Sequence, residues 1–61
     1  MTKINELELQ NIRHLANDAL ATSRKLSFFA QQCQDPTLKN MLQTGARESQ
    51  QTADKLMKFL S

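Results

Sequence analysis

The chain has 61 residues, of which 39% are hydrophobic, and a formal net charge of +2. This length allows one domain at most, with a hydrophobic core of marginal size. The eight basic residues are dispersed among six acidic ones, and no Trp or Tyr is present to stack on bases, so we expect no binding to nucleic acid.

Hydrophobic residues are spread along the chain and do not form one long segment. The longest apolar run is Phe28-Phe29-Ala30, whereas a helix that crosses a bilayer needs about 20 apolar residues. Glu6 and Glu8 interrupt the first apolar stretch, where a signal peptide would need a continuous apolar core. We therefore expect no membrane segment, and synthesis in the cytoplasm, where the lone Cys33 would have no internal disulfide partner.

Residues 4–34, within a few positions at either end, have the periodicity of a helix. Apolar or small residues recur at alternating spacings of four and three, which is typical of a helical seam. Asn5 or Thr2 is expected to cap the start, and Glu6 and Glu8 suit the positive end of the helix dipole. The predicted seam consists of Leu9, Ile12, Ala16, Ala19, Ser23, Leu26, Ala30 and Cys33.

Asp35-Pro36 is the one strong break in the pattern and predicts a turn at 34–36. Proline lacks a backbone N–H, so it is tolerated at the first position of a helix but not in its interior. Aspartate directly before it is a good N-cap for a second helix. The chain has no other proline and a single glycine, Gly45, so no second strong breaker competes with this one.

Residues 36–60, with similar latitude at the end, are predicted to form the second helix. A break of a few residues places two helices antiparallel, so residues whose numbers sum to about 70 lie opposite one another. Leu26 and Phe29 should then lie over Gly45 and Ala46. The predicted seam of this helix consists of Leu38, Leu42, Gly45, Ser49, Thr52, Leu56 and Phe59, with Met41, Ala46, Ala53, Met57 and Leu60 on its flanks.

These elements predict an all-α fold, an antiparallel two-helix hairpin in one domain. Burying a Leu or Phe contributes about 1.5–3 kcal/mol, while ordering one residue costs about 1–2 kcal/mol of backbone entropy. Because the large side chains are few, we expect the lone hairpin to be unstable and two copies to form a homodimeric four-helix bundle. The residues expected in its core and dimer interface are Ile12, Ala16, Ala19, Leu26, Phe29, Leu42, Ala46, Ala53 and Leu56.

The sequence contains few side chains arranged for chemistry. His14 lies four residues before Asp18, which suits an ion pair on one helix face. Bundles with two carboxylate-bridged metals carry Glu-x-x-His, but Glu48 is followed at that spacing by Gln51, so we expect no metal cofactor. A ligand role for His14 or Glu48 stays open. Cys33 is interpreted as a buried structural thiol, and no Ser or Thr has an adjacent base, so we assign no catalytic residue.

The run Asp35-Pro36-Thr37-Leu38-Lys39 follows a Cys-x-Asp step and precedes Leu42 and a Gln-rich helix. This pattern resembles the coat F domain, a family of small ferritin-like helical hairpins of spore-forming Firmicutes. The segments 8–15 and 55–60 also resemble its ends, so the likeness covers essentially the whole chain. The resemblance implies a ferritin-like bundle and a non-enzymatic structural role, with deposition in the spore coat.

Two other functions remain open from the sequence. One is a helical module that binds another protein in sporulation regulation, using the same apolar stripe. Regulators of that kind carry Ser-x-x-x-Asp on the second helix, but Ser49 and Asp54 are one residue further apart here. The other is a metal-binding ferritin-like bundle, for which Gln51 stands where a histidine ligand is needed.

Overall fold

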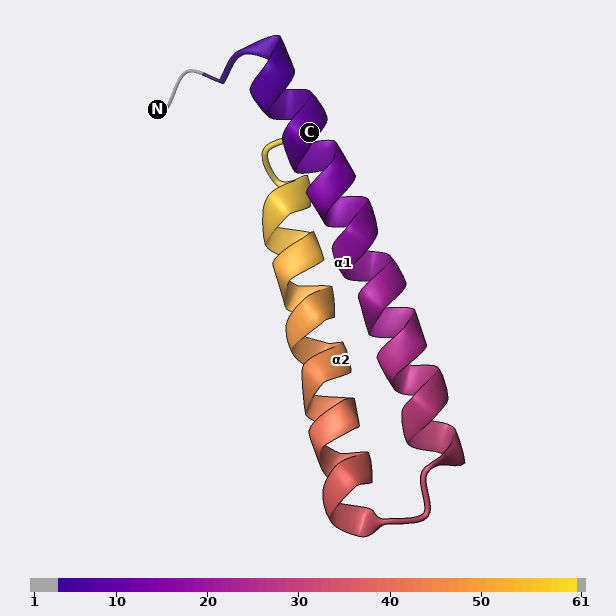
Figure 1. Cartoon of the computed structure of the whole chain (residues 1–61). Coiled ribbons are helices and arrows are strands. Elements are labelled where there is room, and N and C mark those ends of the chain that lie inside the picture. The colour runs from indigo at the N-terminus through magenta and orange to yellow at the C-terminus, as the bar shows by residue number, and fades with distance from the viewer. Residues whose placement is uncertain (1–3, 61) are drawn as a thin grey trace.

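The computed structural model describes residues 4–60 and contains two helices, α1 (Glu6–Gln32) and α2 (Pro36–Met57). They lie side by side and antiparallel, joined by a short turn at one end (Figure 1), and the backbone measures 46 × 17 × 13 Å. The predicted hairpin is therefore confirmed. Both helices are slightly shorter than the predicted 4–34 and 36–60. After α2 ends, Phe59 and Leu60 form turn hydrogen bonds to Leu56 and Met57.

A capping box fixes the start of α1. The Glu8 backbone N–H donates to Asn5 Oδ1 at 2.8 Å, and the Asn5 backbone N–H donates to Glu8 Oε1 at 3.1 Å. These two bonds satisfy donors that a helix N-terminus would leave unpaired. Asn5 is thus the cap, while the alternative, Thr2, lies outside the described residues.

Asp35 and Pro36 start α2 in the predicted way. The Leu38 N–H donates to Asp35 Oδ1 at 2.8 Å, and Pro36 occupies the first helical turn. The Asp35 backbone carbonyl accepts from the Lys39 N–H at 2.9 Å and from Cys33 Sγ at 3.6 Å. Asp35 therefore accepts hydrogen bonds from residues on both sides of the turn.

Replacing this cap is expected to weaken the hairpin. Asp35→Ala should lower the free energy of unfolding by about 1 kcal/mol, because the Leu38 N–H loses its acceptor. Thermal unfolding followed by circular dichroism, at one protein concentration, measures the effect. Asp54→Ala is the control, since Asp54 lies inside α2 and accepts only a solvent-exposed bond from Gln50. Equal melting temperatures for the two variants would contradict the role of the cap.

The two helices meet through small side chains. The buried residues among 4–60 recur every seven positions, and we label this position a of a seven-residue repeat, lettered a to g. The position d residues are partly buried beside them. Alanine at a lets helix backbones approach closely, which would be impossible with Leu or Phe there. The buried residues are Ala16, Ser23 and Ala30 on α1 and Ala46 and Ala53 on α2.

Two contacts report this close approach and the register of the hairpin. Ser23 Oγ donates to the Ala46 backbone carbonyl at 2.8 Å, a buried bond between the helices. A Cβ atom at Gly45 would lie 3.2 Å from Leu26 Cδ1, so that side chain rests almost on the α2 backbone. Leu26 opposite Gly45 is the predicted pairing, and the predicted register is confirmed.

The predicted seam of α2 was partly wrong, because a neighbouring row of residues on this helix faces α1. Leu42, Ser49 and Leu56 belong to the seam as predicted, but Leu38 and Phe59 are exposed. Thr52 is exposed too, and Gly45 is only partly covered. Ala46 and Ala53, which were placed on the flank of this seam but were predicted for the core, are buried at the centre of the contact. The apolar stripe of α2 is wider than one helix contact, and the edge with the small residues turns toward α1 because it permits the closer packing.

Candidate functional site

One long side of the hairpin carries an apolar surface that no part of residues 4–60 covers. In an antiparallel helix pair, position g of one helix lies beside position g of the other, next to the d residues. Both positions are mainly apolar or small in this chain. We define the apolar face as the d residues Ile12, Ala19, Leu26, Leu42, Ser49 and Leu56 with the g residues Leu15, Thr22, Phe29, Leu38, Gly45 and Thr52.

The large g side chains of this face are open to solvent. Leu15 is 53% exposed and Phe29 is 54% exposed, and Leu38 is nearly as exposed. The ring of Phe28, which is at position f and outside this face, lies 6.0 Å from that of Phe29 at 60°. A hairpin that leaves its largest hydrophobic residues outside has packed only one side of each helix, and such a surface is typical of an interaction site.

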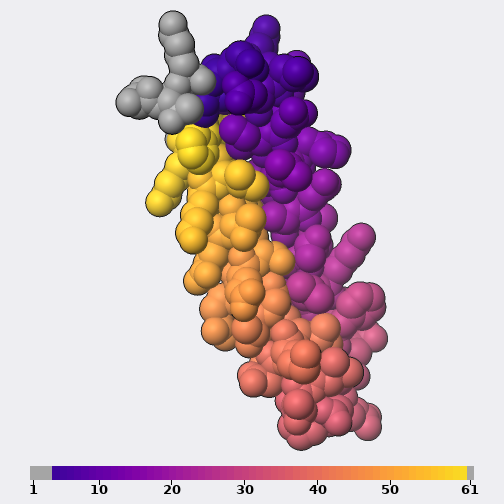
Figure 2. Space-filling view, turned by 60° about the vertical axis from the view of Figure 1, so that its left-hand side comes forward, coloured from indigo at the N-terminus to yellow at the C-terminus, as the bar shows by residue number. Residues whose placement is uncertain are grey.

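The apolar face has a narrow middle and bulky ends. Near the turn it carries large residues such as Phe29 and Leu42, and near the other end it carries Ile12, Leu15 and Leu56. Between them most side chains are small, apart from Leu26, which lies over Gly45. In the space-filling view α2 lies along α1 over most of their length (Figure 2). The small residues of the middle are Ala19, Thr22, Gly45, Ser49 and Thr52.

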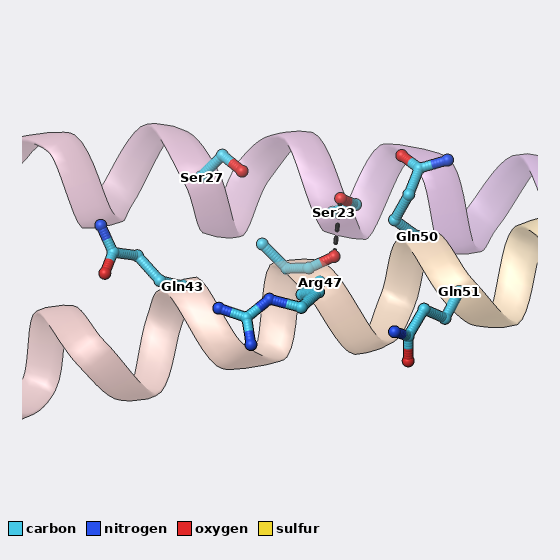
Figure 3. Close-up of a pocket in the computed structure, with 7 residues that line it drawn as sticks. Ser23, Ser27, Gln43, Arg47, Gln50 and Gln51 are labelled. Atoms are coloured by element: carbon cyan, nitrogen blue, oxygen red, sulfur yellow. Dashed lines mark hydrogen bonds between the residues drawn. The ribbon is translucent and has the colours of Figure 1, made fainter.

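The opposite side of the hairpin carries mainly polar residues. It has a shallow hollow of about 340 Å³ between the helices, shown in Figure 3. The Ser23 hydroxyl in it is already bonded to the Ala46 carbonyl, and Gln50 Nε2 donates to Asp54 Oδ1 at 3.1 Å. No histidine or carboxylate lines it to activate a hydroxyl. The lining residues are Ser23, Ser27, Gln43, Ala46, Arg47, Gln50 and Gln51.

The residues predicted for the core and interface fall into three groups. Ala16, Ala46 and Ala53 are buried between the helices. Phe29 is exposed on the apolar face. The partly buried group consists of Ile12, Ala19, Leu26, Leu42 and Leu56. The g residue Leu38 was predicted in the α2 seam but, like Leu15, was absent from the predicted core and interface, although their seven-residue spacing from Gly45 and Thr22 was a usable signal.

The side chains considered as metal ligands or catalytic groups do not lie close together. His14 Nε2 lies 3.6 Å from Asp18 Oδ2, the predicted pair on one helix face, and both side chains are largely exposed. Glu48 is exposed on the other helix. Among residues 4–60, no three His, Cys, Asp or Glu side chains gather in a way that could hold a metal ion. Cys33, expected to be buried, is only partly covered because it follows the last residue of α1 at the end of the hairpin.

Neither helix of the described chain is long and apolar enough to span a membrane. None of the family models, curated proteins or solved structures compared with this chain matches it. Among residues 4–60, the exposed apolar face is the clearest functional signal.

Proposed function

We propose that this chain is a non-enzymatic assembly protein that acts as a homodimeric four-helix bundle. The observation that carries the proposal is the division of its hydrophobic residues. Between the two helices the buried side chains are Ala and Ser, whereas Leu15, Phe29 and Leu38 remain exposed on the apolar face. Small side chains bury too little apolar area to offset the ordering of the backbone. Covering the apolar face supplies the missing burial.

The dispersed reactive groups support a structural role. His14 Nε2 lies near Asp18 Oδ2 on one exposed helix face, and the buried Ser23 hydroxyl joins the two helices. The resemblance of the segment around Asp35-Pro36 to the coat F domain supports a place in the spore coat for the assembled dimer. In that setting a small, self-associating hairpin would serve as a building unit.

Sedimentation equilibrium of the purified chain tests this proposal. We expect a dimer at micromolar concentration, with helicity and dimer fraction falling together on dilution because folding depends on association. A compact, helical monomer at those concentrations would overturn it. A largely unfolded chain that gains helicity only with a different protein would also overturn it, in favour of a binding module for another partner.

A single substitution on the apolar face should weaken the dimer. Leu15→Gln is expected to raise the dimer dissociation constant at least about tenfold, since each copy loses an apolar contact at the interface. The matched control is Leu7→Gln, because Leu7 is 65% exposed but lies at position f, away from the apolar face. Sedimentation of both variants measures the difference. Equal dissociation constants would show that the apolar face is not the interface.

A further inference from the structure

Four charged residues border the apolar face. Position c lies beside position g around a helix, on the side away from the neighbouring helix. This position holds Asp18 and Lys25 on α1 and Glu48 and Lys55 on α2, and all four are exposed. We call them the border charges. At position c, each helix thus carries one acidic residue and, seven residues later, one basic residue.

Resting on the proposed dimer, we propose that the border charges hold a second copy of the chain on the apolar face. Each acid of one copy pairs with a base of the other. In the structure Lys25, Glu48 and Lys55 have no side-chain hydrogen bond or ion pair with any described residue, and Asp18 has only the exposed His14 contact. The border charges are therefore available to a second copy.

The border charges cannot pair well within one copy. Acid and base on the same helix are two turns apart, about 10 Å along the axis, beyond the spacing at which helical neighbours interact. Across the hairpin, position c of each helix points away from the other helix. Any charged protein partner for these side chains would therefore come from another molecule.

A second copy related by a twofold axis presents charges that are complementary to the border charges. When two hairpins pack face to face about a twofold axis, each helix lies against an antiparallel helix of the other copy, whether the turns are at the same end or at opposite ends. Both helices of this chain carry the acid before the base. An antiparallel pair with that order places acid opposite base twice, and a parallel pair would place like charges together.

The direction of the side chains strengthens this pairing. Helical side chains lean toward the N-terminus of their own helix. For Asp18 against Lys55 of the second copy, or against Lys25 of the second copy, the antiparallel orientation makes the two side chains lean toward one another. The small residues Ala19 and Ser49 in the middle of the apolar face let the two hairpins come close enough for the charged ends of these side chains to meet.

The test uses two oppositely charged variants. The acidic variant, Lys25→Glu with Lys55→Glu, has only acids at the border, and the basic variant, Asp18→Lys with Glu48→Lys, has only bases. Each alone should dimerise at least about tenfold more weakly than the natural chain at low salt, because like charges meet. An equimolar mixture should recover the natural dimer fraction as a mixed dimer, and high salt should reduce these differences. Sedimentation gives the dimer fraction, and native mass spectrometry identifies the mixed dimer.

The matched control reverses two bases on the polar side. Arg24→Glu with Arg47→Glu changes the net charge as much as the acidic variant, but both residues lie at position b, away from the apolar face. We expect this control to dimerise like the natural chain. If it weakens the dimer as much as the acidic variant does, or if the mixture of acidic and basic variants gives no mixed dimer, the border-charge inference is overturned while the homodimer stands. A natural chain that stays monomeric would remove the proposed function itself.

Discussion

Leu26→Asp is expected to abolish folding and dimerisation together. Leu26 Cδ1 lies against the α2 backbone at Gly45, so the substitution removes apolar contact between the helices. It also places a carboxylate on the apolar face, where a second copy would take it out of water. Losing a Leu contact costs about 1.5–3 kcal/mol per chain before the cost of the charge is added. A small hairpin has little stability to lose.

Circular dichroism and sedimentation at the same concentration measure this effect. Helicity and dimer mass should both be lost. Leu7→Asp is the control, because it makes the same chemical change at an exposed position in the first turn of α1, where an acid suits the helix dipole. A Leu26→Asp chain that kept natural helicity and dimer mass would count against both the hairpin packing and the dimer.

Ala53→Leu is expected to be similarly harmful for the opposite reason, since it adds volume. Ala53 is fully buried, and the predicted register places it opposite the buried Ala16. A leucine there would force the helices apart and break the Ser23–Ala46 hydrogen bond between them. Overpacking of this kind costs about 1–3 kcal/mol, which corresponds to a fall in melting temperature of roughly 5–20 °C for a domain of this size.

Ala21→Leu is the matched control for this substitution. Ala21 is exposed on the outer side of α1, so the added side chain meets solvent and the change in helix propensity is small. Thermal unfolding at one concentration compares the two variants. If Ala53→Leu melts no lower than Ala21→Leu, the close contact through small residues does not determine the stability of the hairpin.

Much of the architecture follows from short-range signals in the sequence. Asp35 and Pro36 place the turn because capping and the missing proline N–H act over one helical turn. The capping box of Asn5 and Glu8 fixes the start of α1 in the same local way. The buried residues Ala16, Ser23 and Ala30 belong to the predicted α1 seam, because small and apolar residues recur along α1 at regular helical spacing.

The sequence alone therefore predicted two antiparallel helices, the cap of α2 and the register of the hairpin, and it left Asn5 and Thr2 as alternative caps for α1. Which edge of the α2 stripe turns inward was decided only by the tertiary structure. Both Leu38 and Ala46 fit a helical seam, and periodicity cannot rank them. The choice depends on how closely two backbones can approach, a property of residue pairs such as Ser23 with Ala46 on different helices. That choice leaves the large side chains outside and creates the apolar face.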